Sequence, residues 1–372
     1  MDKTFLAYQV EKKGDAFLGK VLERSISDLP KGNLTVKVFY SSLNYKDALS
    51  ASGAKGVTRN YPHTPGIDAV GEVVDCLDNS FEYGEKVIVT GYDLGMDTAG
   101  GFGQYIRVPS SWAVPLPVGL SMYESMCLGT AGLTAAIGID LLEKKNGISG
   151  KKAIVNGATG GVGYLALDIL SMLGSDVTAV TTKLDIKKEL SIIGAKEVLS
   201  IEEFKSYVRQ PLSKGIWDIG YDVVGGELLS DMLTVMTVGG SIACCGIVGG
   251  ATFSSSVFPF ILRGNSLLGV DSQGIEHSKR TSLWNKLATD WKPFNLERFS
   301  REIQLKDLDE EISSTENELS EFKKSSGDKV IKIAAETSAE LIKELIGEEV
   351  NSSSIAAIVE DQSKINRERK DV

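Results

Sequence analysis

A glycine-rich segment that follows a short apolar run is the sharpest chemical signal in the sequence. Ala153-Ile-Val155 leads into Asn156-Gly-Ala-Thr-Gly-Gly-Val-Gly163, which contains Ala158-x-Gly160-x-x-Gly163, a variant of the GxGxxG fingerprint. In such a turn Gly160 lets the backbone approach a pyrophosphate, and Gly163 lets the next helix pack closely on the strand. The N-terminus of that helix supplies N–H donors for phosphates. Strand, turn and helix occur in the expected order, so we predict dinucleotide binding rather than a flexible loop.

The end of the next apolar strand distinguishes between two dinucleotides. Enzymes that use NAD place an Asp or Glu there, which accepts from the ribose 2′-hydroxyl, whereas this sequence reads Ala179-Val-Thr-Thr-Lys183. The hydroxyls of Thr181 and Thr182 can donate to a 2′-phosphate, and Lys183 can neutralise it. We therefore predict NADPH. Two observations leave an alternative open: Lys183 could be an ordinary solvated lysine, and Asp185 follows shortly after it.

The apolar pattern places this fingerprint in an α/β domain that follows a β-rich one. Short β-branched or aromatic runs punctuated by Gly and Pro predict a barrel-like β domain, with strands at 5–10, 34–40, 71–74 and 86–90. A long apolar-rich helix is expected from Met122 to Leu142. Strands then alternate with helices, which predicts a doubly wound parallel sheet. The expected strands are 153–155, 176–180, 197–199, 219–224 and 240–245, with helices at 161–173 and 186–193.

Composition limits the classes of partner and metal site. The chain has 372 residues, enough for two domains, and a net charge of −10, which argues against a general nucleic-acid or membrane-surface binder. No apolar run approaches the roughly 20 residues of a spanning helix, and the N-terminus lacks a signal-peptide core, so we expect a cytoplasmic protein without membrane insertion. The four cysteines form no CxxC pair and only two histidines occur, so no metal site is expected. Cys244 and Cys245 are predicted to be buried small residues.

Several further motifs resemble one known family. Together with the glycine turn, they resemble the zinc-free medium-chain dehydrogenases/reductases, in particular the acrylyl-CoA reductase branch of the quinone oxidoreductase-like group, over about residues 3–311. The motifs are Ser41-Ser-Leu-Asn-Tyr-Lys-Asp-Ala-Leu49, Pro65-Gly-Ile-Asp-Ala-Val-Gly71, Gly84-Glu-Lys-Val87, Gly129-Thr-Ala-Gly-Leu-Thr-Ala135, Val257-Phe-Pro-Phe-Ile-Leu-Arg-Gly264 and Leu268-Gly-Val-Asp-Ser272.

The resemblance implies a fold and an assembly. It implies a GroES-like β-barrel catalytic domain at 1–125 and 268–333, an inserted Rossmann domain at 126–267 that binds NADP, and a helical or frayed extension at 334–372. It also implies a homodimer. Zinc members of the superfamily carry Gly-His-Glu where this chain has Gly66-Ile67-Asp68, so the resemblance implies no catalytic zinc.

The resemblance also implies site residues. Tyr45 would lie beside the nicotinamide and serve as a hydrogen-bond donor or positioning residue, with plain packing as the alternative. Asn44 and Asp47 would shape the catalytic site, although Asp47 could equally cap the following helix. Family members often carry an Arg near the position of Ile201, and its absence here weakens the prediction of NADP. The implied cofactor contacts are Tyr45, Thr159, Gly160, Gly161, Val162, Gly163, Thr181, Thr182, Lys183, Ile247, Ile261 and Ser272.

Three functions are compatible with these features. The first is NADPH-dependent reduction of the double bond of acryloyl-CoA, or another small 2-enoyl-CoA, by hydride transfer to the β-carbon. The second is reduction of quinones or enones on the same fold. The third is a non-catalytic NADPH-binding subunit that its tail tethers to an assembly. Arg107 and Arg263 could contact the cofactor or CoA phosphates, or could form structural ion pairs.

The C-terminal tail departs from the family pattern near residue 312. Residues 311–350 show apolar positions at helical spacing, which predicts an amphipathic helix that could bind a helical partner. Gly327-Asp-Lys-Val-Ile-Lys-Ile333 could provide a closing strand or continue a helix. Residues 312–364 resemble the C-terminal part of the b subunit of F-type ATP synthase, as expected of a natural fusion or of an artefact of gene prediction or assembly. An added helix that packs on the body is the alternative.

Overall fold

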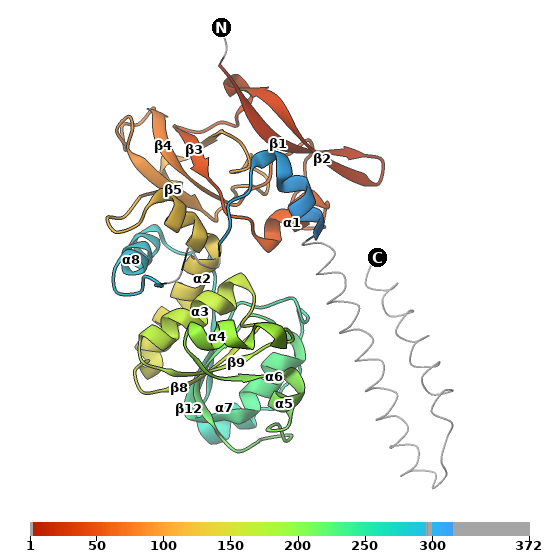
Figure 1. The fold of residues 1–372 in the computed structure, drawn as a ribbon, viewed down its shortest axis with the longest axis vertical. Coiled ribbons are helices and arrows are strands. Elements are labelled where there is room, and N and C mark those ends of the chain that lie inside the picture. The colour runs from red at the N-terminus through yellow and green to blue at the C-terminus, as the bar shows by residue number, and fades with distance from the viewer. Residues whose placement is uncertain (1–2, 295, 297–299, 315–372) are drawn as a thin grey trace. The chain divides into compact units, whose positions relative to one another are not determined.

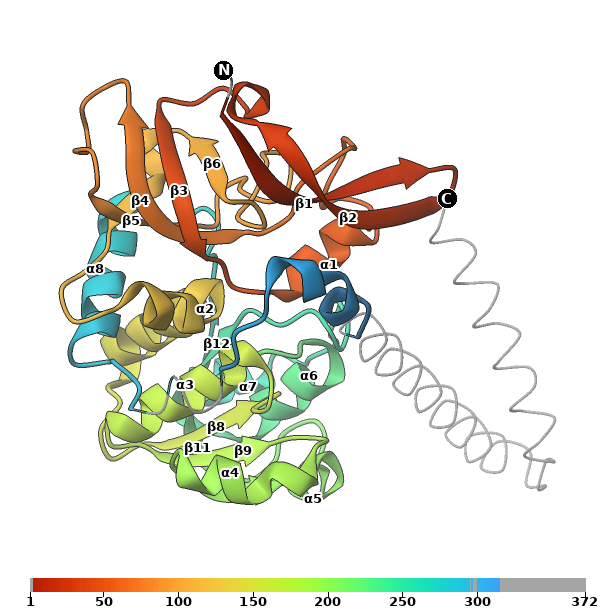
Figure 2. The same ribbon diagram turned by 45° about the horizontal axis from the view of Figure 1, so that its top comes forward.

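The computed structural model describes residues 3–294, 296 and 300–314 (Figures 1 and 2). The chain divides into two compact units, Met1–Ser313 and Ser314–Val372, and almost every described residue lies in the first. The predicted closing strand at 327–333 and most of the predicted amphipathic helix therefore lie outside the described residues.

The N-terminal part forms the predicted barrel-like β structure. The expected strand at 34–40 is confirmed as β3, and the runs at 5–10, 71–74 and 86–90 lie within β1, β4 and β5. A five-stranded antiparallel sheet has the order β6-β3-β4-β5-β7, and β1 and β2 form a separate hairpin. The strands are β1 (Thr4–Lys13), β2 (Ala16–Ser25), β3 (Leu34–Tyr40), β4 (Asp68–Cys76), β5 (Lys86–Thr90), β6 (Tyr105–Val108) and β7 (Ala113–Pro115), with short helices η1 (Ile26–Asp28), α1 (Tyr45–Ala51) and η2 (Ser110–Trp112).

A long apolar helix, α2 (Met122–Asn146), links this part to the parallel sheet. Ser121 and Glu124 form a capping box that starts the helix. By length and composition α2 could cross a membrane, but 78% of its most apolar window is buried within the protein. That burial is what a core helix shows, because its apolar side chains already pack on both neighbouring sheets.

The parallel sheet has the predicted doubly wound topology. Its strand order is β10-β9-β8-β11-β12-β13, so the chain moves outward from β8 and then returns to its other side. The prediction for 176–180 is confirmed as β9. The strands are β8 (Lys152–Asn156), β9 (Asp176–Val180), β10 (Ala195–Leu199), β11 (Trp217–Asp222), β12 (Met236–Cys244) and β13 (Ser266–Gly269).

Helices cover both faces of this sheet, as the alternation of side chains along each strand requires. Ala153 and Val155 pack in a cluster with α2, α3 and α4, whereas Ile154 packs on the other face with α5, α6 and α7. The helices are α3 (Gly161–Met172), η3 (Leu184–Ile186), α4 (Lys187–Ile192), α5 (Ile201–Lys205), α6 (Gly226–Val235) and α7 (Phe258–Arg263). Because α2 and β13 span the predicted domain boundaries at 125 and 267, those boundaries stay predictions.

After the parallel sheet the chain returns to the N-terminal part. Helix α8 (His277–Ala288) packs on α2 and β7. The 3-10 helix η5 (Leu305–Asp307) and residues 308–314 then lie against β1, β2 and α1. Leu308 and Ile312 are buried in that cluster, and Asp309 accepts a hydrogen bond from the Tyr8 hydroxyl at 2.7 Å.

Candidate active site

The glycine turn has the geometry of a phosphate-binding loop. Gly160 is the N-cap of α3, and its amide donates to the Gly157 carbonyl at 2.9 Å. A Cβ at Gly163 would lie 2.4 Å from the Gly157 oxygen, so only glycine allows this helix to approach the strand. A Cβ at Gly160 would meet only that oxygen, at an ordinary 3.4 Å. Protein atoms therefore do not demand glycine at 160, and the open space at the helix N-terminus suits a phosphate group.

A buried polar pair braces the crevice at the switch point between β8 and β11. Asn156 at the end of β8 donates to the carboxylate of Asp222 at the end of β11. Asp222 also accepts from the Gly225 amide at 3.0 Å and from the Cys244 thiol at 3.3 Å. In doubly wound sheets the dinucleotide crosses the sheet at this point, so the pair fixes the loops that would contact it.

The two adjacent cysteines are only partly buried, which corrects the expectation that they are core residues. Cys245 donates to the Asp222 backbone oxygen at 3.6 Å. Burial is the main cause that raises the pKa of the Cys244 and Cys245 thiols to about 12. Both thiols therefore stay protonated and weakly nucleophilic near neutral pH.

The predicted 2′-phosphate segment follows β9. Thr181 is buried, and its hydroxyl accepts from the Lys183 amide at 3.0 Å and lies 3.3 Å from the Thr159 hydroxyl. Thr181 thus joins the two loops that would hold the adenosine and pyrophosphate groups. Thr182 and Lys183 are exposed, as is Asp185 in η3. The predicted donors directly follow the carboxyl end of β9, and Thr181 contacts Thr159 of the phosphate turn.

The Asn44-Tyr-Lys-Asp47 motif forms the start of α1. Asn44 is the N-cap, and Asp47 at the third helical position takes part in a capping box with it, so Asp47 helps to cap α1 without being the N-cap itself. The buried Asp47 carboxylate accepts from the Asn44 amide at 2.8 Å, the Gly66 amide at 3.0 Å and the Ile67 amide at 2.9 Å. Burial, partly opposed by these donors, raises its pKa to about 7. Asp47 therefore ties α1 to the 66–67 turn, and its three backbone partners favour a positioning role.

A second buried carboxylate, Asp68, joins α1 to α2. It accepts from the Asn44 side-chain amide at 2.8 Å, from the Thr130 amide at 2.8 Å and from the Thr130 hydroxyl at 2.6 Å. Burial raises the pKa of Asp68, whereas these donors lower it. Helix α2 is interrupted at Gly129, whose φ of 49° and ψ of −152° are not helical. A Cβ there would lie 2.6 Å from Asp68 and 2.3 Å from the Ser42 hydroxyl, so the interruption lets Thr130 reach Asp68.

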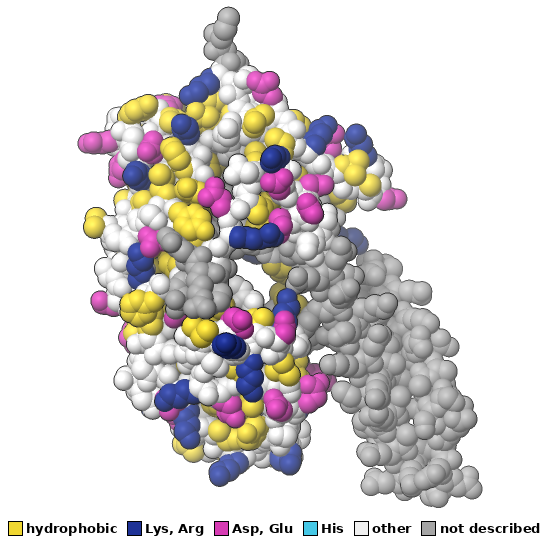
Figure 3. Space-filling view, in the orientation of Figure 1, with side chains coloured by type: hydrophobic (Ala, Val, Ile, Leu, Met, Phe, Trp, Pro, Cys, Tyr) yellow, Lys and Arg dark blue, Asp and Glu magenta, His cyan; other side chains and the backbone are white. Residues whose placement is uncertain are grey.

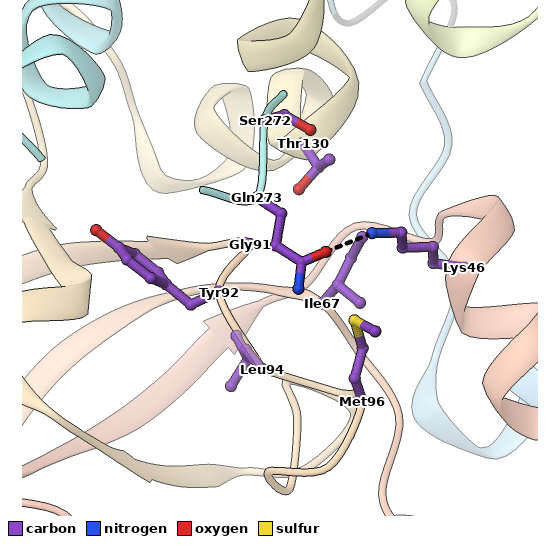
Figure 4. Close-up of a pocket in the computed structure, with 9 residues that line it drawn as sticks. All are labelled: Lys46, Ile67, Gly91, Tyr92, Leu94, Met96, Thr130, Ser272 and Gln273. Carbon is purple, nitrogen blue, oxygen red and sulfur yellow. Dashed lines mark hydrogen bonds between the residues drawn. The ribbon is translucent and has the colours of Figure 1, made fainter. Parts of the chain in front are cut away.

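These contacts surround a pocket beside α1 (Figure 4). Ile67, Leu94 and Met96 give it an apolar wall, and the Lys46 ammonium donates to the Gln273 side-chain oxygen at 3.0 Å. Ser272, a predicted cofactor contact, belongs to the same lining. The nine lining residues are Lys46, Ile67, Gly91, Tyr92, Leu94, Met96, Thr130, Ser272 and Gln273.

The donor set in this pocket does not suit a metal ion. Ile67 occupies the position where zinc members carry a histidine, and a hydrocarbon side chain offers no ligand atom. Among the described residues, no group of three or more His, Cys, Asp and Glu is arranged to hold a metal. The two nearby carboxylates are occupied by hydrogen bonds from the backbone, Asn44 and Thr130.

The remaining predicted site residues are dispersed. Tyr45 is the first residue of α1 and half-buried, but it is not part of the pocket lining. Ile247 follows β12 at the carboxyl edge of the sheet and is 58% exposed. Ile261 lies on α7 and is 69% exposed. The cofactor contacts of all three residues stay predictions.

Arg263 and Arg107 form hydrogen bonds with other parts of the protein. Arg263 donates to the Thr234 and Met236 carbonyl oxygens at 2.9 and 2.6 Å. Arg107 donates to the Thr35 hydroxyl at 3.2 Å. Within the described residues neither forms the predicted alternative, an ion pair, since their hydrogen-bond partners are carbonyl and hydroxyl oxygens. Both arginines brace the scaffold.

Several residues that shape the pocket were not predicted from the sequence. Arg280 on α8 is fully buried and donates to the Thr90, Ser272 and Gln273 carbonyl oxygens at 2.7, 3.1 and 3.1 Å. It holds the pocket segment 272–273 against the end of β5. Lys46 lies within the motif at 41–49, but the sequence of that motif gives no sign of its partner Gln273, which is 227 positions away. The available signal for Arg280 was its place at helical spacing with the apolar residues Leu283, Trp284 and Leu287, because a charged residue on such a face needs buried partners.

Comparison with known proteins places these features in a family. Residues 30–118 match the alcohol dehydrogenase GroES-like domain, and residues 161–289 match the zinc-binding dehydrogenase domain. YhfP of Bacillus subtilis, which carries a quinone oxidoreductase name, is 42% identical over 82% of this chain and 94% of that protein. Acrylyl-CoA reductase AcuI of Ruegeria pomeroyi is 40% identical over 77% of this chain and 88% of that one.

Solved structures show the same similarity. The structure of YhfP with NAD bound covers 85% of this chain and 97% of its own, with a TM-score of 0.82 and 39% identity. The YhdH oxidoreductase from Salmonella enterica in complex with NADP covers 84% of this chain and 97% of its own, with a TM-score of 0.81 and 37% identity.

The chain also has a shorter match of a different kind. Over 64 residues, 17% of this chain and 36% of the relative, it is 56% identical to ATP synthase subunit b of Pelagibacter ubique. The two matched family domains cover most of the barrel-like part and of the parallel sheet. The chain belongs to the medium-chain dehydrogenase/reductase family.

Proposed function

We propose that the protein catalyses NADPH-dependent reduction of the carbon–carbon double bond of acryloyl-CoA, or of another small 2-enoyl-CoA, to the saturated thioester, propanoyl-CoA in the first case. The observation that carries this proposal is the pocket beside α1, in which an apolar wall faces a lysine ammonium and Ile67 replaces a metal ligand. The relationship to AcuI supports the substrate class.

The residues present fit a bound NADPH. The open N-terminus of α3 at Gly160 accommodates the pyrophosphate, and Thr182 with Lys183 suits a 2′-phosphate. Solved relatives from Salmonella enterica and Escherichia coli contain NADP or NADPH, whereas YhfP contains NAD. When bound, the reduced nicotinamide supplies a hydride. The protein aligns the donor and acceptor carbons, excludes water with Ile67 and Leu94, and stabilises charge on the thioester oxygen.

The test is oxidation of NADPH by the purified chain, followed by absorbance with acryloyl-CoA, crotonoyl-CoA and a benzoquinone as separate acceptors. NADH with each acceptor is the control for cofactor choice. We expect acryloyl-CoA with NADPH to give the highest kcat/KM. Turnover of quinone alone would reject the proposed substrate and support the second candidate. Binding of NADPH without turnover of any acceptor would support a non-catalytic subunit.

Quinone or enone reduction is the second candidate, because YhfP carries a quinone oxidoreductase name. The same pocket serves both reactions, since both place negative charge on an oxygen conjugated to the reduced bond.

We also propose that the protein is located in the cytoplasm.

We also propose that the protein is a homodimer. Within the described residues β13 pairs only with β12, which leaves one edge of the parallel sheet open. Exposed apolar side chains precede this strand: Ile247, Phe253, Val257, Phe258, Ile261 and Leu262. Light scattering on the intact chain and on Leu262→Glu tests the proposal. A monomeric wild-type protein would reject it.

A further inference from the structure

We propose that Lys46 is a catalytic residue, whose ammonium binds the substrate carbonyl oxygen and stabilises the negative charge that develops there. This role rests on the proposed function, for which Lys46 would supply the oxyanion donor. Lys46 is the only charged residue among the nine that line the pocket. Figure 4 shows its side chain reaching from α1 toward Gln273, with Ile67 below its end and Met96 lower still.

One neutral partner holds the ammonium in place. Lys46 Nζ donates to Gln273 Oε1 at 3.0 Å. The Gln273 backbone is itself fixed, because its amide donates to Asp271 at 2.9 Å and its carbonyl oxygen accepts from Arg280 at 3.1 Å. An ammonium has three N–H donors, and within the described residues Gln273 is its one hydrogen-bond partner. Donors therefore remain for a ligand.

The nearby carboxylates do not neutralise Lys46 by contact. Asp47 directs its oxygens to the Asn44, Gly66 and Ile67 amides. Asp68 is likewise occupied by Asn44 and Thr130, and the Thr130 hydroxyl is used in that bond. Both carboxylates are fully buried. The hydrogen bonds of Asp47 and Asp68 therefore direct both carboxylates to other groups, while Lys46 lines the pocket.

The apolar wall strengthens what Lys46 can do. Ile67 is 4% exposed and Leu94 is fully buried, and they form the pocket with Met96. A charge interaction in such surroundings is stronger than in water, and a fixed donor needs no reorganisation as charge develops. This is the environment in which a single oxyanion donor has a large effect on rate.

The electron and proton balance shows where such a donor acts. The hydride that a bound NADPH would supply, on oxidation to NADP+, forms a C–H bond at the β-carbon, and the π pair moves toward the α-carbon and the carbonyl oxygen to give an enolate. Lys46 hydrogen-bonds to that oxygen and keeps its own proton. A proton taken up from solvent, relayed by water, then bonds to the α-carbon, the carbonyl re-forms, and the saturated thioester and NADP+ are released.

The kinetic test compares Lys46→Met, which keeps length but loses charge, with Lys46→Arg, which keeps charge. We expect Lys46→Met to lower kcat for acryloyl-CoA by about 10²- to 10³-fold, as for loss of one oxyanion donor, with KM changed much less. Lys46→Arg should recover part of the loss. The matched control is Lys37→Met on the exposed face of β3, which removes the same charge outside the pocket. Gln273→Leu should give an intermediate loss because it releases the ammonium.

A second readout needs no turnover. Acetoacetyl-CoA has an acidic methylene group, and its enolate absorbs in the ultraviolet where the keto form does not. Wild-type protein without NADPH should raise the enolate fraction of bound acetoacetyl-CoA, and Lys46→Met should abolish that increase while binding NADPH normally. An unchanged enolate spectrum in Lys46→Met would overturn the assignment.

The same measurement separates the two proposals. Acetylacetone forms an analogous 1,3-dicarbonyl enolate without the CoA portion. If only acetylacetone forms an enolate on the protein, in a Lys46-dependent manner, the role of Lys46 stands and the acyl-CoA substrate is rejected. If acryloyl-CoA is reduced equally well by Lys46→Met, the proposed function stands and the role of Lys46 is rejected.

Discussion

Gly160 and Gly163 of the phosphate turn are glycines for different physical reasons, and substitution by alanine can distinguish the two reasons. Gly160 has φ −85° and ψ 159°, which any residue adopts, and a Cβ there meets only the Gly157 oxygen at 3.4 Å. Gly160→Ala should therefore change the free energy of unfolding by less than about 0.5 kcal/mol. Its methyl group should nevertheless weaken NADPH binding about tenfold or more, because it occupies the space at the helix N-terminus.

Gly163→Ala should show the opposite pattern and serves as the matched variant. Its Cβ would lie 2.4 Å from the Gly157 oxygen, so α3 must shift at a cost of about 1–3 kcal/mol. Denaturant unfolding and NADPH fluorescence titration measure the two effects. Equal destabilisation by both substitutions would contradict this division of roles.

Asp47 should make stability depend on pH. Burial raises its pKa to about 7 in the folded protein, against about 3.9 in an unfolded chain. Between these values the folded protein retains a proton that the unfolded chain has lost. The stabilising contribution is therefore fully present below about pH 4 and is lost as pH rises through about 7.

Asp47→Asn tests this dependence. The variant should lose about 1–3 kcal/mol at low pH, because its amide cannot accept from all three backbone partners. The free energy of unfolding of the wild type should fall toward that of the variant between about pH 4 and 8. Asp168 and Asp231, whose pKa values burial raises to about 6, are present in both proteins and cancel in the difference. A difference that stays constant with pH would refute the assignment to Asp47.

At the residue scale, the sequence predicted what local spacing determines. The glycine turn has a fixed number of residues between strand and helix, so the close helix packing at Gly163 could be predicted, whereas the pyrophosphate contact of Gly160 stays a prediction. Lys46 and Gln273 are 227 positions apart, and Arg280 lies 190 positions from Thr90. No local pattern encodes such pairs, since they depend on how the parallel sheet returns the chain to the barrel-like part.

At the scale of elements, the interruption of α2 carries the clearest prediction. Gly129→Ala places a Cβ 2.3 Å from the Ser42 hydroxyl and 2.6 Å from Asp68, which would break the hydrogen bonds between Asp68 and Thr130. Gly147 at the end of the same helix also has a positive φ, 71°, but nothing lies within 4 Å of its Cβ. Gly147→Ala should cost about 1–3 kcal/mol from backbone strain alone.

Gly129→Ala should be destabilised further than Gly147→Ala by about 1–3 kcal/mol, the penalty for a buried acceptor that loses its donor. Thermal unfolding of both variants measures the difference. Gly129→Ala should also lower activity, since Asp68 holds Asn44 at the start of α1. Similar melting temperatures for the two variants would show that the Asp68 contacts contribute little.

Hydrophobic patterns predicted long elements such as β1, β3, α2 and α3 at least in part, but they missed β2, α6 and α8 as well as short or interrupted elements. The strands β3 and β9 were predicted because β-branched and aromatic residues predominate in these short runs. The short β7 was not predicted, because three residues carry little periodicity. The interruption of α2 was missed as well, because glycine within an apolar helical run does not by itself reveal a bend.

At the scale of the whole molecule, the predicted absence of a general nucleic-acid interface is an argument about charge and stays a prediction. Figure 3 shows Lys and Arg side chains interspersed with Asp and Glu over the described part of the face it draws. Mixed charge of this kind does not create the one-sided field that phosphate backbones require. The net charge of −10 points in the same direction.

The boundary between body and tail can be located by truncation, because the last described segment packs on the body. Leu308 and Ile312 are 4% and 3% exposed, within a cluster that contains Tyr8 and Ala48. Burial of two such side chains contributes about 3–6 kcal/mol. A chain of residues 1–314 keeps them, whereas a chain of residues 1–302 loses them together with the Tyr8–Asp309 hydrogen bond.

We therefore expect the 1–314 chain to unfold at the temperature of the full chain and to keep its NADPH affinity and turnover. The 1–302 chain should be destabilised by about 3–6 kcal/mol and should lose activity, because the same cluster supports the helix that carries Lys46. Calorimetry and NADPH oxidation on the three chains provide the comparison. If the 1–314 chain fails to fold, the residues after 314 belong to the catalytic body. If it keeps full activity, the tail acts independently of the chemistry, as a tether would.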